Sequence, residues 1–533
     1  MSAARPFNRA FDLPDRAMPL AVAATFAAAA VLFFTSLNAP LQEPDEVRYA
    51  EVSRQMLASQ SWLVPVLDGE PYLDKPPLTY WLVMSSYRTF GVHDWSARLV
   101  SASAGFLVIV LIWWWARLAG SARVGLTAAL LLTLTGRFVY LARMLTPDSV
   151  LCVCVLLGWI GLERALNGRR LEWRWWLVSA MAAGLGTLTK GPVAIVLVGM
   201  PAFMLCLLQS RRVRPRWYQV VAWAGMLSIV TGPWYLLLSS REPEFVHHFF
   251  WRHNITRFVA PFDHAEPFWF YLPGLLLGTL PWCLLVPGFV AWLLASNGNR
   301  NRNEAPVRQR CKRTCWRAWR RLRACPPALG FWILAFAWCM LFFSCSGCKR
   351  AVYIVPAFPP LTMVLGWSYC RLGSWLHPWR AAIPVFVVLL IGVCFLLPAY
   401  AERFSLRRQV AEPCSTAEQE TMNVICFPRR WDSVSYYLRR DDVRCFSSEQ
   451  MSEMYEELES CPATLVFLKP GESYTTFVEN LPSSLEFEAA GKGGLAIAGW
   501  VRQRQFSLKS SVGAGSRPSG SRTNFALQSQ QRS

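Results

Sequence analysis

Long runs of apolar residues, separated by short polar segments, dominate the first 400 positions of the chain. A helix of about 20 apolar residues spans the hydrocarbon core of a bilayer, which is about 30 Å thick. The pattern therefore predicts an all-α, polytopic membrane protein with about eleven to thirteen transmembrane helices. Eleven spans can be marked, at about 18–38, 96–116, 124–142, 147–163, 175–188, 191–208, 218–238, 268–293, 328–345, 351–369 and 381–400.

The pattern changes after about residue 400. Apolar runs shorten to strand length, and segments with helical spacing alternate with them. The sequence therefore predicts a transmembrane domain over 1–400 and a small α/β domain over 401–507, followed by a disordered tail over 508–533 that is rich in Ser, Gly, Arg and Gln. Strands are expected at 423–427, 442–446, 463–468 and 495–501, and helices at 430–439 and 448–460.

Composition supports a membrane protein. Of 533 residues, 53% are hydrophobic and only 17% are charged, whereas a soluble domain carries about 25% charged residues. The formal net charge of +20 could indicate a nucleic-acid partner, but that interpretation needs basic residues clustered on an accessible face. We expect contacts with membrane lipids and no nucleic acid.

The basic residues gather in alternate connections between the spans, at 5–16, 117–123, 164–174, 211–216, 300–323 and 371–380. Short cytoplasmic loops carry an excess of Lys and Arg. The N-terminus is therefore expected inside, and the α/β domain, which follows an odd number of spans, outside. The arginine-rich loop at 297–327 is interpreted as a topology anchor, with anionic lipid headgroups as an alternative ligand.

Sixteen cysteines add little chemistry. Those within apolar spans are interpreted as small buried hydrophobes, and neither the Cys311–Cys315 spacing nor the Cys345–Cys348 pair stands in a zinc or redox motif. Four cysteines of the α/β domain could pair in an oxidising compartment, and three connectivities stay open for Cys414, Cys426, Cys445 and Cys461.

The first external loop begins with Pro44, which suits the first turn of a short helix. Asp45 would lie at the N-terminus of this helix, on one face with Arg48 and Tyr49. Val47, Met56 and Leu57 are expected to touch the membrane surface. The alternative is a helix cap and a solvated ion pair.

The same loop continues with Tyr72, Asp74 and Lys75 immediately before a Pro-Pro break. A lysine acts as a point charge for phosphate, and a neighbouring carboxylate can orient it. The segment is therefore a candidate phosphate site, with an ordinary loop salt bridge as the alternative. Two more charges, Asp148 and Lys190, stand at span ends, where charge usually marks a site or an aqueous cavity. Snorkelling of Lys190 and a helix-dipole role for Asp148 are the alternatives.

Residues 247–258 combine three His, two Arg and several aromatics, and they resemble the wall of a site. Arg257 can bind phosphate with both arms of its guanidinium. His253 could help Asp74 hold a divalent ion, zinc or magnesium, or could satisfy an ordinary hydrogen bond. Another external corner, formed by Lys349, Arg350, Tyr353 and Pro356, supplies further cations, with positive flanking of a span as the alternative.

Six motifs occur in a fixed order between residues 44 and 356: P-D-E-V-R-Y-A-E, Y-L-D-K-P-P-L, T-P-D, T-K-G-P, H-N-I-T-R-F and K-R-x-x-Y-x-x-P. In this order they resemble the bacterial aminoarabinose lipid A transferases and their relatives in the protein mannosyltransferase superfamily. The resemblance implies a GT-C glycosyltransferase of the bacterial inner membrane, with its site and α/β domain facing the periplasm. Its donor would be a polyprenyl-phosphate-linked sugar.

By the same matching, Asp45 and Asp148 are the catalytic acidic residues. Arg48, Tyr72, Lys75, Lys190, Arg257, Lys349 and Tyr353 would bind the donor phosphate and substrate, and Asp74 with His253 would hold a metal, although many relatives carry Glu at the position of Asp74. Cations would stabilise the leaving phosphate, and Asp45 needs to act as a base only with a hydroxyl acceptor. The expected acceptor is a lipid A phosphate; the alternative enzyme moves another sugar to a periplasmic protein or glycan. A transporter would place charges at mid-membrane and contain internal repeats, and neither is evident.

Overall fold

The computed structural model describes residues 17–208, 213–261, 263–294, 326–372, 378–403, 405–411, 422–492 and 495–504. The chain divides into two compact units, Met1–Ser405 and Leu406–Ser533. The expected tail, most of the arginine-rich loop, Cys311, Cys315 and Cys414 lie outside the described residues.

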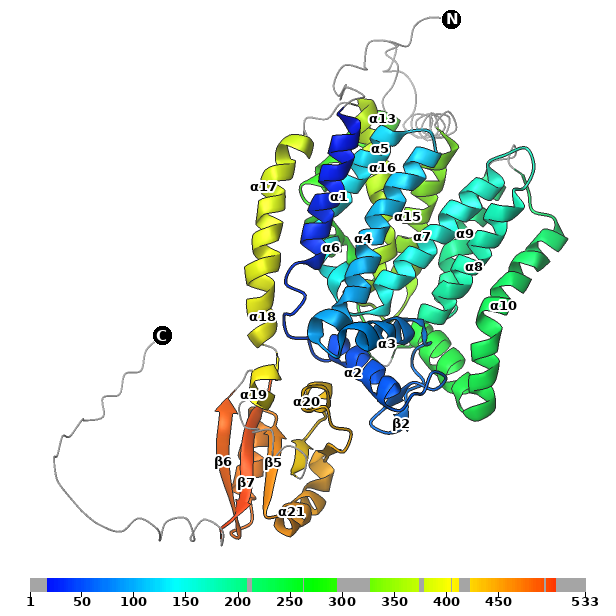
Figure 1. Cartoon of the computed structure of the whole chain (residues 1–533). Coiled ribbons are helices and arrows are strands. Elements are labelled where there is room, and N and C mark those ends of the chain that lie inside the picture. The colour runs from blue at the N-terminus through cyan, green and yellow to red at the C-terminus, as the bar shows by residue number, and fades with distance from the viewer. Residues whose placement is uncertain are drawn as a thin grey trace, which may run out of the picture. The chain divides into compact units, whose positions relative to one another are not determined.

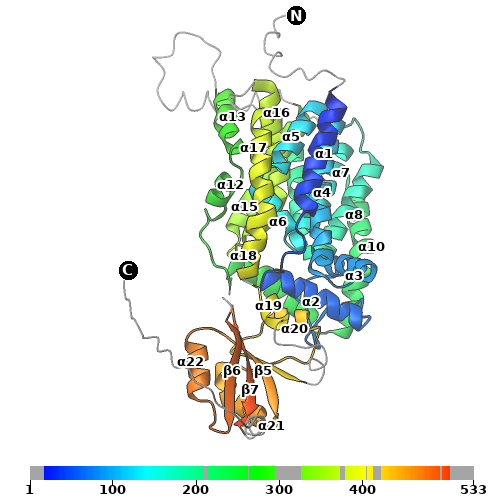
Figure 2. The ribbon, with the colours of Figure 1, turned by 60° about the vertical axis from the view of Figure 1, so that its left-hand side comes forward.

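The first unit is a bundle of helices that lie side by side (Figures 1 and 2). Every predicted span coincides with a helix or a consecutive helix pair. The helices are α1 (Met18–Phe34), α4 (Asp94–Leu118), α5 (Ala122–Thr133) with α6 (Gly136–Arg143), α7 (Pro147–Leu166), α8 (Trp173–Lys190), α9 (Val193–Leu208), α10 (Trp217–Arg241), α12 (Tyr271–Gly278) with α13 (Leu285–Leu294), α15 (Pro327–Cys345), α16 (Phe358–Leu372), and α17 (Pro378–Ile391) with α18 (Leu397–Arg403).

Six of the described helices are long and apolar enough to cross a membrane, and eight spans result if each of two bent pairs counts as one. The pairs α5–α6 and α12–α13 bend by 70° and 99°, and α1 and α9 are apolar but shorter. Pro281 lies in the second bend, where its missing N–H prevents continuation of a regular helix. The chain is thus a multi-pass membrane protein.

The elements that carry the motifs gather at one end of the bundle, away from the described arginine-containing connections at 117–123, 164–174 and 213–216. They are α2 (Asp45–Ala58), the short hairpin β1 (Val66–Leu67) and β2 (Glu70–Pro71), α3 (Leu78–Phe90), the π-helix η1 (His247–Thr256) and the 3-10 helix η3 (Ala351–Ala357). One expectation for α2 is wrong: Val47 and Met56 are fully buried within the protein and do not face the membrane surface.

A buried ion pair fixes the start of α2. Glu46 accepts hydrogen bonds from Arg98 of α4 at 2.8 and 2.5 Å and from the backbone N–H groups of Leu145 and Gln42 at 2.8 and 3.0 Å. Arg98 also donates to the carbonyl oxygens of three residues that precede the helix: Leu37, Ala39 and Pro40. The second acidic residue of the first motif therefore anchors the loop, which leaves Asp45 at the helix start to face the site.

Replacing Glu46 with Gln is expected to destabilise the protein by about 3–5 kcal/mol, because Arg98 keeps its charge in a buried place without a counter-ion. The measurement is the melting temperature and yield of the purified variant in detergent. Glu70→Gln, at an exposed position in the same loop, is the matched control and should melt like the wild type. Equal melting temperatures for Glu46→Gln and the wild type would contradict this role.

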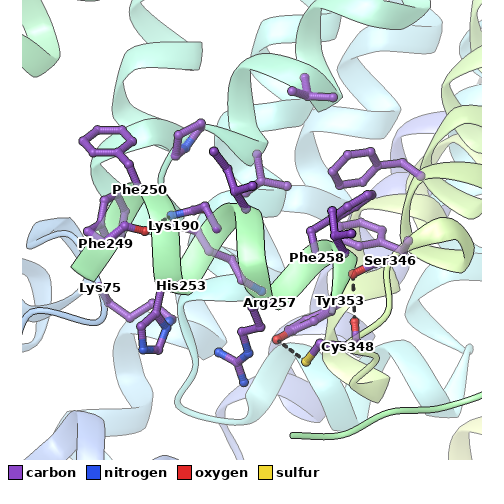
Figure 3. Close-up of a pocket in the computed structure, with 18 of the residues that line it drawn as sticks. Lys75, Lys190, Phe249, Phe250, His253, Arg257, Phe258, Ser346, Cys348 and Tyr353 are labelled. Carbon is purple, nitrogen blue, oxygen red and sulfur yellow. Dashed lines mark hydrogen bonds between the residues drawn. The ribbon is translucent and has the colours of Figure 1, made fainter. Parts of the chain in front are cut away.

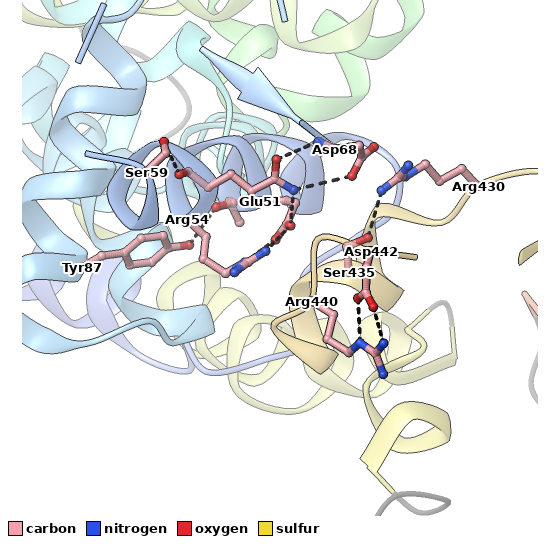
Figure 4. A network of polar contacts seen from close by, with 11 residues as sticks. Glu51, Arg54, Ser59, Asp68, Tyr87, Arg430, Ser435, Arg440 and Asp442 are labelled. Atoms are coloured by element: carbon pink, nitrogen blue, oxygen red, sulfur yellow. Dashed lines mark hydrogen bonds and ion pairs between the residues drawn. The ribbon is translucent and has the colours of Figure 1, made fainter. Parts of the chain in front are cut away.

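A second network holds the loop between α2 and α3 (Figure 4). Glu51 accepts hydrogen bonds from Arg54 at 2.8 and 2.7 Å and from Gln55 at 2.7 Å. Gln55 in turn accepts the backbone N–H of Asp68 at 2.7 Å, in the turn between β1 and β2. This contact sets the path of the chain into Tyr72, Asp74 and Lys75.

The second unit contains a five-stranded mixed sheet with the order β4-β3-β5-β7-β6. Strands β3 (Asn423–Phe427), β4 (Arg444–Cys445) and β5 (Ala463–Leu468) are parallel, whereas β7 (Ile497–Gln503) and β6 (Leu485–Lys492) are antiparallel to their neighbours. The sheet is buried on both faces, because alternate residues of β3 and β5 enter two different hydrophobic cores.

Helices α19 (Arg407–Ala411) and α20 (Asp432–Leu438) contribute to one core, and α21 (Met451–Ser460) and α22 (Glu472–Glu479) to the other. An ion pair between Arg440 and Asp442 follows α20 (Figure 4). The predicted α/β class is correct, although the sequence pattern did not indicate β6 and α22. Three of the four cysteines of this unit, Cys426, Cys445 and Cys461, are described, and no disulfide joins these three.

Candidate functional site

Two adjoining cavities, of 460 Å³ and 250 Å³, lie where the motif-bearing elements meet. We call the larger one the apolar cavity, because its remaining walls are mainly aromatic and aliphatic side chains of η1, α9 and α15, several of which appear in Figure 3. We call the smaller one the polar cavity. The two cavities share six residues: Asp74, Lys75, Lys190, His253, Arg257 and Tyr353.

Asp148, which lines only the polar cavity, forms a close pair with Lys190 of the shared set. Asp148 lies in the first turn of α7, Lys190 is the last residue of α8, and their side chains meet at 2.5 Å. The Lys190 ammonium also lies 3.9 Å from the centre of the Tyr353 ring, a cation–π contact. Lys190 is therefore directed into the site, not toward the membrane surface.

The backbone conformation and close packing at position 191 explain why a glycine follows Lys190. The φ of +90° at Gly191 ends α8, and a Cβ atom there would lie only 2.7 Å from the Phe249 ring of η1. A side chain would therefore be strained in this backbone conformation and would push against η1. The glycine lets α8 stop at Lys190 while η1 packs directly over it.

Lys75 and Arg257 complete a group of three cations. Arg257, just after η1, is held by both arms of its guanidinium on Asp263, at 3.0 and 2.6 Å. Lys75 is enclosed by the loop that precedes α3. Burial lowers the pKa of its ammonium to about 8, although the charge of Asp74 favours the protonated form. Three cations from three separate segments thus meet at the junction of the two cavities.

Asp74 contacts two histidines of η1. Its Oδ1 atom lies 2.9 Å from Nε2 of both His248 and His253, and their ring centres are 4.9 Å apart. Burial acts to raise the pKa of Asp74, but the hydrogen bond from His253 and the charge of Lys75 hold it well below its usual value. One oxygen and two ring nitrogens lie within 4.8 Å of one another, a spacing that a metal ion can bridge. Asp74 and His253 were predicted for this role from the sequence, whereas His248 was not.

Asp45, Arg48 and Tyr49 line the polar cavity together, as the helical spacing of the first motif predicts, and Tyr72 of the second motif joins them. Its carboxylate forms an ion pair with Arg350, which precedes η3. The contact joins the first and last motifs across 305 positions of the chain.

Lys349 has a different environment. Its ammonium donates hydrogen bonds to the backbone carbonyl oxygens of Glu266 at 2.7 Å and Ser346 at 2.5 Å. It is buried and lines neither cavity. Lys349 therefore stabilises the turn between α15 and η3, and its neighbour Arg350 is the residue that lines the polar cavity.

Two further residues of the site, Asp263 and Cys348, were not predicted as site residues from the sequence. Cys348 lies 3.5 Å from Asp263 and 3.9 Å from the hydroxyl of Tyr353, and the Tyr353–Cys348 contact is drawn in Figure 3. Arg350, in contrast, was named from the sequence as a further cation of the corner that carries Lys349 and Tyr353, and it lines the polar cavity. Nothing in the local sequence around Asp263 marks its pairing with Arg257.

Comparison with known proteins identifies similar chains. The profile of the dolichyl-phosphate-mannose-protein mannosyltransferase family matches residues 74–235. The undecaprenyl phosphate-alpha-4-amino-4-deoxy-L-arabinose arabinosyl transferase of Pectobacterium carotovorum is 30% identical over 391 residues, 69% of this chain and 64% of that protein. A protein of the same description from Sodalis glossinidius is 34% identical over 63% of this chain and 57% of its own length. The match thus spans less than two thirds of these relatives.

The fold is similar to that of a solved structure. The crystal structure of ArnT from Cupriavidus metallidurans bound to undecaprenyl phosphate matches with a TM-score of 0.73 and 21% identity, and covers 90% of this chain and 97% of the other. The same protein in the apo state matches with a TM-score of 0.70. The fold of this chain therefore has a precedent in a solved structure.

Proposed function

We propose that this chain, which belongs to the aminoarabinose-transferase branch of the protein mannosyltransferase superfamily and has the GT-C fold, transfers 4-amino-4-deoxy-L-arabinose from undecaprenyl phosphate to a lipid A phosphate. The observation that carries the proposal is an apolar cavity that ends at three cations, Lys75, Lys190 and Arg257. A lipid phosphate complements this cavity, since its apolar tail matches the apolar walls and its anionic head matches the three cations.

The polar cavity would then receive the sugar. Displacement at the anomeric carbon places negative charge on the departing lipid phosphate and positive charge on the sugar. The three cations would stabilise the first charge as it grows, and Asp45 and Asp148 would face the second. Because a lipid A phosphate is already ionised, no general base is required.

Location on the bacterial inner membrane, with the site open to the periplasm, belongs to the same proposal. It is supported by the described arginine-containing connections at 117–123, 164–174 and 213–216, which lie at the end of the bundle away from the cavities and which the positive-inside rule assigns to the cytoplasm. A transferase that moves another sugar to a periplasmic protein or glycan is the alternative. It would use the same cavities and differ in the acceptor.

The function is tested with the purified chain in proteoliposomes that contain labelled undecaprenyl-phosphate-aminoarabinose and lipid A. We expect label to move to lipid A that carries phosphates and not to dephosphorylated lipid A. Transfer to a protein or glycan but not to lipid A would support the alternative. Consumption of no lipid-linked sugar would contradict both.

A divalent cation at Asp74, His248 and His253 is a second proposal. Two imidazoles and one carboxylate suit zinc better than magnesium, which prefers oxygen ligands. The two histidines converge on one carboxylate oxygen, so the residues fit such an ion. When bound, the ion would add positive charge beside Lys75. The side chains of Asp74, His248 and His253 already join the loop before α3 to η1 without it.

We expect about one zinc per chain in protein purified without chelator, measured by elemental mass spectrometry. His248→Ala and His253→Ala should each lose most of this metal. His247→Ala, at the exposed preceding position, is the matched control and should retain it. Metal content that is the same in all three variants would contradict the site.

A further inference from the structure

The charged residues are divided between the two cavities. Lys75, Lys190 and Arg257 line both cavities, whereas Arg48 and Arg350, among the described residues, line only the polar one. A donor whose tail fills the apolar cavity would meet the first three cations with its phosphate. The two arginines line the cavity that also holds Asp45.

Both arginines are close to Asp45. Arg48 lies three positions further along α2, on the same helical face. Arg350 forms an ion pair with the Asp45 carboxylate. A guanidinium has five N–H donors in a planar fork, so Arg350 can keep this contact and still offer donors to a second anion.

The corner that carries Arg350 is firmly held. The preceding Lys349 donates to Glu266 and Ser346, and the backbone N–H of Gly347 donates to the carbonyl oxygen of Phe258 at 2.7 Å. The N–H of Lys349 also donates to His264 at 3.0 Å. Arg350 is therefore presented from a fixed backbone, which favours a role in orienting a ligand.

We propose that Arg350, assisted by Arg48, binds the phosphate of the acceptor. This inference rests on the proposed function, in which the acceptor is an anion. Donor and acceptor phosphates repel each other, so each needs cations of its own, and the division of charges between the cavities supplies two sets. A hydroxyl acceptor would have no use for a guanidinium fork matched to phosphate oxygens.

The transfer balances without a further reactant. An oxygen of the acceptor phosphate, held by Arg350, forms the new bond to the anomeric carbon. The bond from that carbon to the donor phosphate oxygen breaks, and its electron pair stays on undecaprenyl phosphate beside Lys75, Lys190 and Arg257. No proton moves, because the acceptor phosphate is already ionised.

The test uses the full chain in proteoliposomes and measures KM for lipid A and for the lipid-linked donor separately. Arg350→Gln should raise KM for lipid A by at least about tenfold, the effect of losing one or two charge-assisted hydrogen bonds, and should leave KM for the donor within about twofold. Arg350→Lys, which keeps the charge but not the fork, should lie between. Arg88→Gln, an exposed arginine of α3 outside both cavities, is the matched control and should change neither value.

Stabilisation by the product undecaprenyl phosphate shows whether Arg350→Gln is folded. Undecaprenyl phosphate should raise the melting temperature of Arg350→Gln as it raises that of the wild type. An unchanged KM for lipid A, or equal increases in both KM values, would overturn the acceptor role of Arg350 while the wild-type transfer upholds the proposed function. Failure of the wild-type chain to use any phosphate acceptor would overturn both.

Discussion

Asp45→Asn is expected to reduce sugar transfer by at least about a hundredfold, because the substitution removes a negative charge that faces the developing positive charge of the sugar. The carboxylate lies at the start of α2 and lines the polar cavity, where Arg350 holds it in place. Asparagine has nearly the same shape, so packing around α2 is preserved. The measurement is the initial rate of transfer in proteoliposomes.

The neighbouring acidic residue provides the contrast. Asp45→Asn should melt at the wild-type temperature, because Asp45 is partly exposed to the cavity. Glu46→Gln should lose stability, since Glu46 is fully buried against Arg98. Near-normal transfer by folded Asp45→Asn would remove Asp45 from the mechanism.

Arg257→Gln should also have a large effect, with transfer lowered by about a hundredfold to a thousandfold. Arg257 is one of the three cations at the junction of the cavities, and Asp263 orients both arms of its guanidinium. Its loss removes a donor from the place where negative charge develops on the leaving phosphate. Arg257→Lys should recover only part of the rate, because lysine cannot bind two oxygens with a planar fork.

The measurement combines transfer rates with the binding of undecaprenyl phosphate, followed by the shift that it causes in the melting temperature. Arg257→Gln should show a smaller shift than the wild type. Arg252→Gln, an exposed arginine on the outer face of η1, is the matched control and should behave like the wild type. Equal losses in Arg257→Gln and Arg252→Gln would indicate a general effect of charge and contradict a specific phosphate contact.

The sequence is sufficient to place the helices, because apolar runs long enough to cross a bilayer are a strong signal in a chain with so few charged residues. It does not reveal where a run bends. The runs at 124–142 and 268–293 are each two helices, which bend by 70° and 99° at the breaks. In the α/β unit, β6 has the alternating apolar residues Leu485 and Phe487, but glutamates and a glycine between and after them weaken the signal.

The sequence predicts individual residues of the candidate site where they stand in a recognisable motif, but it does not show which of them come into contact. Asp148 and Lys190 were found separately at span ends, and the structure brings them together. His248 was missed because residues five apart lie on different faces of an α-helix, whereas the wider turn of the π-helix η1 aligns His248 with His253. Asp263 and Cys348 acquire their contacts only through the tertiary fold.

Transfer of aminoarabinose to lipid A can be measured in cells by mass spectrometry of lipid A, with strains that carry the chain, lack it, or carry Asp45→Asn. We expect aminoarabinose on the lipid A phosphates with the wild-type chain alone, together with higher survival in polymyxin. Lipid A of identical mass in all three strains, under conditions where the donor is present in the membrane, would show that the chain is not a lipid A transferase.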